Sequence, residues 1–143
     1  MNYSFGQMSL SKLNSCHKDL QLIMLDAISQ SKVDFGISEG KRSLPKQQEL
    51  YKKGLSRIDG INKRGKHNMT PSMAVDVYAW VQGKGNWDDA HLGYLAGVIL
   101  RSADDLYGEG RIDHKVRWGG DWDGDGIIAL DHSLKDLPHF ELI

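Results

Sequence analysis

The stretch KDLPHFEL, residues 135–142, predicts a turn followed by a short strand. Pro138 disfavours helical geometry in the residue before it. In an extended strand His139 and Glu141 share one face, and the two apolar residues beside them share the other. The apolar face would anchor the strand in a core, with the carboxylate of Asp136 just outside it. A metal-bound water and a general base need such an arrangement. One histidine on a strand is more often structural, so this interpretation depends on partners upstream.

The composition limits the classes of protein and of site that the chain can form. Its 143 residues suit one domain with a full core, and we expect a single monomeric domain spanning residues 1–143. Lysine and arginine total 18 and aspartate and glutamate 19, a formal net charge of -1. That balance gives no electrostatic basis for binding nucleic acid or an anionic membrane. Because Cys16 is the one cysteine, a metal site would use histidine and carboxylate ligands.

The sequence gives no sign of a membrane span or of a signal peptide. It lacks an apolar run of about 18 residues, so no membrane-spanning helix is expected. The first residues, MNYSFG, have neither a basic lead nor an apolar core. We therefore expect the protein to be made and first kept in the cytoplasm.

Hydrophobic periodicity divides the chain into helices and short strands. Apolar spacing predicts helix over 9–30, in two pieces, and over 87–108 with Asn86 as its cap. Proline in the first turn and glycine at the end predict a helix over 45–54. Strands are predicted over 33–38, from residue 73 onward, around 116–118 and at the C-terminus. This pattern predicts an α+β fold, with a small antiparallel sheet that carries the site and helices packed mainly on one face.

Three upstream features are candidate partners for the C-terminal strand. A glycine turn would place Arg42 at the mouth of a strand, as either a surface cation or an anion clamp. Residues 55–70 form a long basic loop, which is either solvated or meets an acidic substrate. Asp76 stands among apolar residues, and burying a lone carboxylate is costly unless a metal or an arginine meets it. His67 precedes that strand by a loop and can fold back beside Asp76.

An acidic segment after residue 120 matches the D-x-D-x-D-G opening of a calcium loop. Alternating carboxylates converge on a hard cation there, and the sixth-position glycine allows a sharp turn. The twelfth position, usually glutamate, holds His132. The helices that flank an EF-hand loop are not predicted here, and the alternative is an Asx-rich turn. The candidate calcium ligands are Asp121, Asp123, Asp125, Ile127 and Asp131.

Taken together, these segments resemble the zinc peptidases of the M15 group. The resemblance covers nearly the whole chain and is closest to small phage endolysins that cut L-Ala-D-Glu bonds in peptidoglycan. The group also includes VanX- and VanY-type peptidases, which cleave D-Ala-D-Ala bonds. The motifs that carry the resemblance are Gly40-x-Arg42-Ser43, His67, Ala74-Val75-Asp76, Trp118-Gly119-Gly120-Asp121-Trp122 and Asp136-x-Pro138-His139-Phe140-Glu141-Leu142.

The resemblance implies a zinc site with one open position and a set of residue roles. Asp136 would be the catalytic carboxylate, Arg42 would bind substrate or the developing oxyanion, and Gln47 matches a recurring polar position near the substrate. His67 and Asp76 are nine residues apart, two more than is common in the group, which we interpret as a longer loop. The zinc ligands implied are His67, Asp76 and His139, with His91, His114 and His132 as alternatives.

The resemblance also implies a function, a zinc-dependent peptidoglycan endopeptidase that acts on the stem peptide during host lysis. The enzyme would reach the cell wall or periplasm through a membrane pore made by another protein. Calcium is expected to switch it on by ordering the acidic loop. One alternative is a D-Ala-D-Ala carboxypeptidase or dipeptidase with the same zinc site. The other is a non-catalytic, calcium-dependent wall-binding module that keeps the fold.

Overall fold

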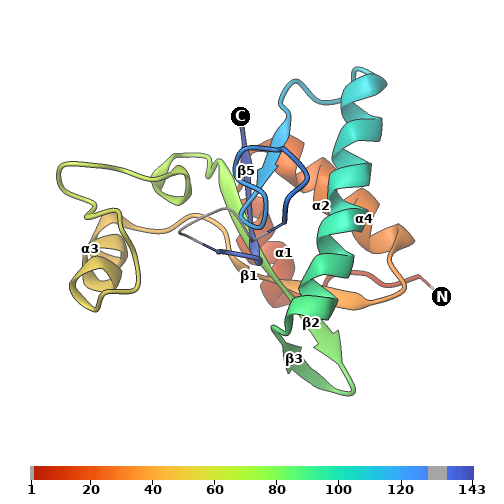
Figure 1. The fold of residues 1–143 in the computed structure, drawn as a ribbon, viewed down its shortest axis with the longest axis horizontal. Coiled ribbons are helices and arrows are strands. Elements are labelled where there is room, and N and C mark those ends of the chain that lie inside the picture. The colour runs from red at the N-terminus through yellow and green to blue at the C-terminus, as the bar shows by residue number, and fades with distance from the viewer. Residues whose placement is uncertain (1, 129–134) are drawn as a thin grey trace.

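The computed structural model describes residues 2–128 and 135–143 and has an α+β architecture, as predicted (Figure 1). Asp131 and His132 therefore lie outside the described residues. The helices are α1 (Gln7–Asn14), α2 (Lys18–Gln30), α3 (Leu44–Lys52), the 3-10 turn η1 (Lys66–Asn68) and α4 (Asp89–Gly108). The strands are β1 (Asp34–Glu39), β2 (Ala74–Val81), β3 (Lys84–Asn86), β4 (Val116–Trp118) and β5 (His139–Leu142).

The strands form one antiparallel sheet in the order β1-β2-β5-β4, with the short β3 paired to β2. The chain therefore returns from its far end to insert the C-terminal strand β5 beside β2. This pairing sets Asp76 directly opposite His139, residues that are 63 apart in sequence. The predicted small antiparallel sheet is confirmed, and its central pair of strands carries the candidate ligands.

Side-chain alternation along β2 separates a core face from a polar face. Val75, Val77 and Ala79 are fully buried in the core, where β2 contacts α4, whereas Asp76 points to the other side of the strand. On β5, Phe140 and Leu142 are likewise fully buried in the core. Helices α1, α2 and α4 lie together beside the sheet, while α3 and the segment after it stand apart from that layer (Figure 1). Among the described residues no helix is long and apolar enough to cross a bilayer.

The start of α4 differs from the predicted one. Asp88, not Asn86, caps the helix, because its carboxylate accepts the backbone N–H of His91 at 2.8 Å. Asn86 instead ends β3, a strand that was not predicted. A tight turn with positive φ at both Gln82 (51°) and Gly83 (82°) joins β2 to β3. Glutamine seldom adopts positive φ, so the sequence lacked the usual signal for such a hairpin.

A buried carboxylate connects the start of α2 to the segment that leads into β4. Asp19 is fully buried, and its Oδ2 accepts the backbone N–H groups of Asp113 (2.9 Å) and His114 (3.2 Å) and pairs with the His114 ring at 2.8 Å. His17 caps α2 by accepting the Asp19 N–H. Burial alone would raise the pKa of Asp19, but these hydrogen bonds hold it below the usual value.

We predict that Asp19→Ala lowers the free energy of unfolding by about 3 kcal/mol, because buried N–H groups lose their acceptor. Denaturant titration measures this, with Asp104→Ala, an exposed aspartate on α4, as the matched control. Because the folded-state pKa is depressed, the Asp19 contribution is complete above the unfolded value of about 3.9 and is lost as pH falls below it. Equal midpoints for the two variants near neutral pH would contradict this role.

Candidate metal centre and its cleft

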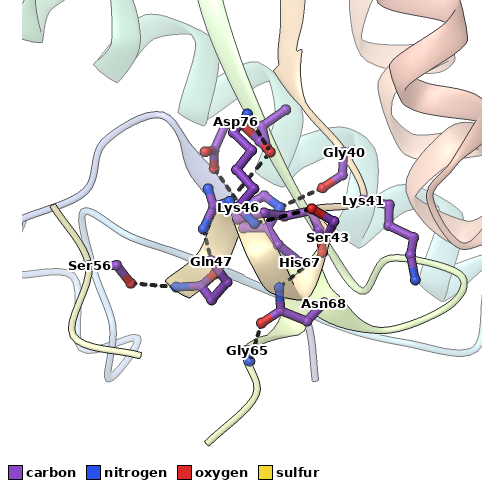
Figure 2. Close-up of polar contacts among 12 residues, drawn as sticks. Gly40, Lys41, Ser43, Lys46, Gln47, Ser56, Gly65, His67, Asn68 and Asp76 are labelled. Atoms are coloured by element: carbon purple, nitrogen blue, oxygen red, sulfur yellow. Dashed lines mark hydrogen bonds and ion pairs between the residues drawn. The ribbon is translucent and has the colours of Figure 1, made fainter. Parts of the chain in front are cut away.

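The structure brings His67, Asp76 and His139 together, as the sequence predicted. Each offers one ligand atom, and the three atoms lie within 4.8 Å of one another. The Asp76 Oδ1 atom is 3.2 Å from His67 Nε2 and 3.1 Å from His139 Nδ1. Figure 2 shows His67 between Asp76 on one side and Gly40 on the other. Two imidazoles and a carboxylate are a donor set that zinc accepts, and three protein ligands leave a position open.

The longer loop between His67 and Asp76 does not displace the histidine. His67 lies on η1 and is 5 % exposed, and its Nδ1 is 2.7 Å from the carbonyl oxygen of Gly40. A carbonyl can only accept, so Nδ1 must carry a proton, and Nε2 is the ring nitrogen that faces Asp76. The buried amide of Asn68 fixes this turn by accepting the Gly65 N–H and donating to the Arg42 carbonyl (Figure 2).

His139 is oriented by a carboxylate on its own strand. Its Nε2 is 2.8 Å from Glu141 Oε1, so the other nitrogen, Nδ1, faces Asp76. Arg117 on β4 donates to the second oxygen of Glu141 at 2.8 Å. The sequence placed Glu141 on the His139 face by alternation alone, and this placement is confirmed. The contribution of Arg117 was missed, because nothing local indicated that β4 would lie beside β5.

The pKa values of Asp76, His139 and Glu141 depend on the hydrogen bonds that these residues make with one another and with their neighbours. Burial by itself would raise the pKa of Asp76, but hydrogen bonds from His139 and His67 hold it well below its usual value. Burial would lower the pKa of His139, but Asp76 and Glu141 raise it to about 9. Burial would raise the pKa of Glu141, but hydrogen bonds with His139 and Arg117 lower it to about 2. Before any cation binds, a protonated His139 balances the charge of the carboxylates on either side of it.

Asp136 lies at the edge of the group, with its Oδ2 4.0 Å from His139 Nδ1. Its side chain is 42 % exposed and faces the cleft. Burial, and then the charge of Asp76, raise the pKa of Asp136. The turn that carries it is clamped to Gly119, whose carbonyl accepts the Asp136 N–H and whose N–H donates to the His139 carbonyl. A side chain at residue 119 would collide with the Asp136 carbonyl, which explains the glycine there.

Arg42 lines the same cleft and is held by two neighbours. Its Nε donates to Glu39 at 3.4 Å and its Nη1 to the side-chain oxygen of Gln47 at 3.0 Å. Nη2 has no hydrogen-bond partner among the described residues. Gln47 is almost fully buried and donates to the Ser56 hydroxyl and the Ile58 carbonyl, each at 2.8 Å (Figure 2). Its amide is therefore used to hold Arg42 and the loop after α3.

The cleft around this group has a volume of about 1130 Å³. It extends from the metal end, where Trp122 and Arg117 contribute, to α3 and the basic loop that follows it. The indole of Trp122 lies 5.4 Å from the His139 ring and forms one wall. The site is thus reachable by a substrate, not sealed inside the core.

Two of the alternative histidines, His91 and His114, do not join the centre. His114 lies with His17 and Asp19 in a second group, but His17 Nδ1 already caps α2 and Asp19 Oδ2 already accepts the Asp113 and His114 N–H groups. His91 pairs with the helix cap Asp88 at 2.8 Å on the surface. His132 lies outside the described residues.

The first three acidic residues of the candidate calcium loop also converge. Their ligand atoms lie within 4.8 Å of one another. The Asp121 carboxylate accepts the Gly126 N–H at 3.0 Å, and Asp125 accepts that of Ile127 at 2.8 Å. These turn hydrogen bonds also fit the Asx-rich alternative. Since Asp131 is not described, the closing side of the loop stays a prediction.

We predict that His139→Ala and Asp76→Ala each abolish stoichiometric zinc binding by the purified chain, since two ligands hold zinc far more weakly than three. Metal content after dialysis measures this. His91→Ala, which removes a half-buried histidine outside this group, is the matched control and should retain about one zinc per chain. A full equivalent of zinc in His139→Ala would show that the ligands are elsewhere.

Comparisons with known proteins agree with this geometry. The family model for phage L-alanyl-D-glutamate peptidase matches residues 1–143. The L-alanyl-D-glutamate peptidase of Escherichia phage T5 is 26% identical over 145 residues, covering 100% of both chains. The crystal structure of the Serratia marcescens L-Ala D-Glu endopeptidase ChiX superposes with a TM-score of 0.77 at 30% identity, covering 98% of this chain and 90% of that one. The chain belongs to the phage L-alanyl-D-glutamate peptidase family.

Proposed function

We propose that this protein is a zinc-dependent peptidoglycan endopeptidase that hydrolyses the L-Ala–D-Glu bond of stem peptides, as a monomer with one domain over residues 1–143. The observation that carries the proposal is the convergence of His67, Asp76 and His139 in an open cleft, with Asp136 at its edge. Membership of the phage L-alanyl-D-glutamate peptidase family supports the choice of the L-Ala–D-Glu bond as the one that is cleaved.

His67, Asp76 and His139 would hold the metal through Nε2, a carboxylate oxygen and Nδ1. When bound, zinc supplies Lewis-acid polarisation of the scissile carbonyl and a water of lowered pKa. With a metal bound, the buried Gly40 carbonyl and Glu141 would each accept a hydrogen bond from one ring nitrogen, which would leave the nitrogen that faces Asp76 to bind the metal. The protein therefore fixes the ligand orientations before any cation arrives.

Asp136 would act as the general base. It would accept a proton from the attacking water and deliver it to the leaving amine nitrogen. Its raised pKa favours this exchange, because a carboxylate with a pKa closer to neutral both takes up and returns a proton readily. Its position outside β5, on a turn clamped by Gly119, keeps it near the centre without making it a third carboxylate of the buried group.

Arg42 would stabilise the oxyanion or hold a substrate carboxylate. Glu39 and Gln47 fix its guanidinium in place, and its Nη2 remains for the substrate. A donor positioned in advance needs little reorganisation as charge develops, which is the basis of oxyanion stabilisation. We propose that Gln47 acts through Arg42 and the adjoining loop and does not itself contact the substrate.

The proposed activity is tested by mass spectrometry of purified muropeptides incubated with the zinc-loaded protein. New L-Ala carboxyl ends and D-Glu amino ends support the endopeptidase. Released D-Ala would instead support the carboxypeptidase or dipeptidase alternative. Intact muropeptides with retained wall binding would support the non-catalytic module.

We predict that Asp136→Asn lowers kcat by about 10³-fold, because the isosteric amide cannot accept the proton. Zinc content and the unfolding midpoint should stay at wild-type values, because Asp136 is not one of the three ligands. Asp104→Asn serves as the control for loss of an acidic group elsewhere. Wild-type turnover by Asp136→Asn would show that Asp136 is not the general base.

We also propose that calcium regulates the enzyme through Asp121, Asp123 and Asp125, with Asp131 and the Ile127 carbonyl completing the site. Two contacts support the link. Trp122, inside the acidic loop, lies against His139, and Arg117 lies 6.0 Å from the Trp122 ring while it holds Glu141. Ordering this loop would therefore position a metal ligand. Calcium scarcity in the cytoplasm would keep the enzyme inactive until it reaches the wall through a pore made by another protein.

We predict that a calcium-selective chelator lowers the activity of the zinc-loaded enzyme at least tenfold, and that added calcium restores it. The double variant Asp123→Asn/Asp125→Asn should be insensitive to both treatments, since its loop lacks two carboxylate ligands. Lysis of exposed cell walls measures the rate, with zinc content checked in parallel. Unchanged activity in the presence of the chelator would contradict the proposal that calcium regulates the enzyme.

A further inference from the structure

Charge is unevenly distributed along the cleft. The carboxylates of Glu39, Asp76, Asp136 and Glu141 line its metal end, where Glu39 pairs with Arg42 and Lys46 and Glu141 pairs with Arg117. The opposite end is lined by the loop of residues 55–66, which contributes Arg57, Lys63 and Arg64. Lys63 and Arg64 are exposed and have no ion pair with a described carboxylate. The far end of the cleft is therefore positively charged.

The one acidic residue of this loop, Asp59, forms no ion pair with Lys63 or Arg64. Asp59 accepts the backbone N–H groups of Ile61, Asn62 and Lys63 at 2.9–3.0 Å and does not line the cleft. Its carboxylate is therefore used to shape the loop. Gln48 adds a bond to the Gly60 carbonyl at 3.2 Å, which attaches the same turn to α3. The loop that carries Lys63 and Arg64 is therefore held by Asp59 from within and by Gln48 from α3.

The substrate of the proposed reaction has a matching asymmetry. The L-Ala amine is acylated by the lactyl group of the muramic acid, so the sugar side of the scissile bond carries no free carboxylate. D-Glu continues the peptide through its γ-carboxyl, which leaves its α-carboxylate free, and further carboxylates follow along the stem. All the negative charge of the muramyl peptide therefore lies on the leaving-group side of the bond.

We infer that Lys63 and Arg64 form a subsite for the free carboxylates of the D-Glu side of the stem peptide. This inference rests on the proposed function. The pairing fixes the polarity of the substrate, with the D-Glu portion over the 55–66 loop and the sugar-linked L-Ala on the other side of the metal centre. The two residues are specificity-determining, since they recognise charge beyond the reacting atoms.

The subsite is tested with soluble muropeptides that differ only in amidation. One series carries D-Glu with a free α-carboxylate, a second carries the D-isoglutamine amide, and a third is amidated at the next carboxylate along the stem. Lys63→Gln/Arg64→Gln should raise KM about tenfold for the free-carboxylate substrate and leave kcat nearly unchanged, since exposed ion pairs contribute modestly to binding. For the substrate lacking the recognised carboxylate, wild type and variant should have nearly equal KM.

Three controls keep the result interpretable. Lys18→Gln/Lys52→Gln removes two exposed cations outside the cleft and should behave as wild type. Lys63→Arg/Arg64→Lys keeps both charges and should restore the wild-type KM. The wild-type KM for the free-carboxylate substrate should rise with salt more steeply than that of the glutamine variant.

A KM unaffected by Lys63→Gln/Arg64→Gln would overturn the subsite, as would an equal rise for all three substrates. Failure of the proposed function has a different signature, because wild type would then cleave none of the series. In that case binding still tests the subsite. The isolated peptide product that begins with D-Glu should bind the wild type more tightly than it binds the glutamine variant, and equal affinities would overturn the inference.

Discussion

The antiparallel pairing of β2 with β5 is the constraint on which the site depends. It places Asp76 opposite His139 and aligns the core residues of both strands on the other face. Fully buried Val75 and Phe140 pair in the same register, so a slip of one residue would turn them out of the core and turn the proposed metal ligands into it. The hydrophobic pattern that stabilises the sheet therefore also specifies the geometry of the centre. The packing of the core residues is therefore sufficient to fix the register of β2 against β5 at the site.

Around this pair, the two histidines among the proposed ligands are each held by a neighbouring residue. The Gly40 carbonyl orients His67, Glu141 orients His139, and Arg117 holds Glu141. These contacts come from the end of β1, from β5 and from β4. A buried group of two histidines and two carboxylates is stable only if every member is hydrogen-bonded. The result is a partly exposed centre next to a cleft whose far wall carries Lys63 and Arg64, which pair with no carboxylate in the described part of the chain.

Much of this arrangement was predictable from the sequence. Alternation in HFEL, residues 139–142, separates ligand from core residues, and the placement of a lone acid among apolar residues identifies Asp76. The hairpin at Gln82-Gly83 was not predictable, because glutamine rarely adopts the positive φ that the turn requires. The tautomers of the ligands and the contribution of Arg117 depend on which strands become neighbours. Local patterns do not encode that adjacency, whereas the family resemblance supplied the His67 pairing despite its longer loop.

X-ray absorption and anomalous diffraction at the zinc edge test the central claim most directly. We predict one zinc coordinated by His67 Nε2, an Asp76 oxygen, His139 Nδ1 and one further light atom from solvent. Zinc bound instead at His17, Asp19 and His114, or a centre in which His139 is turned away from the metal, would contradict it.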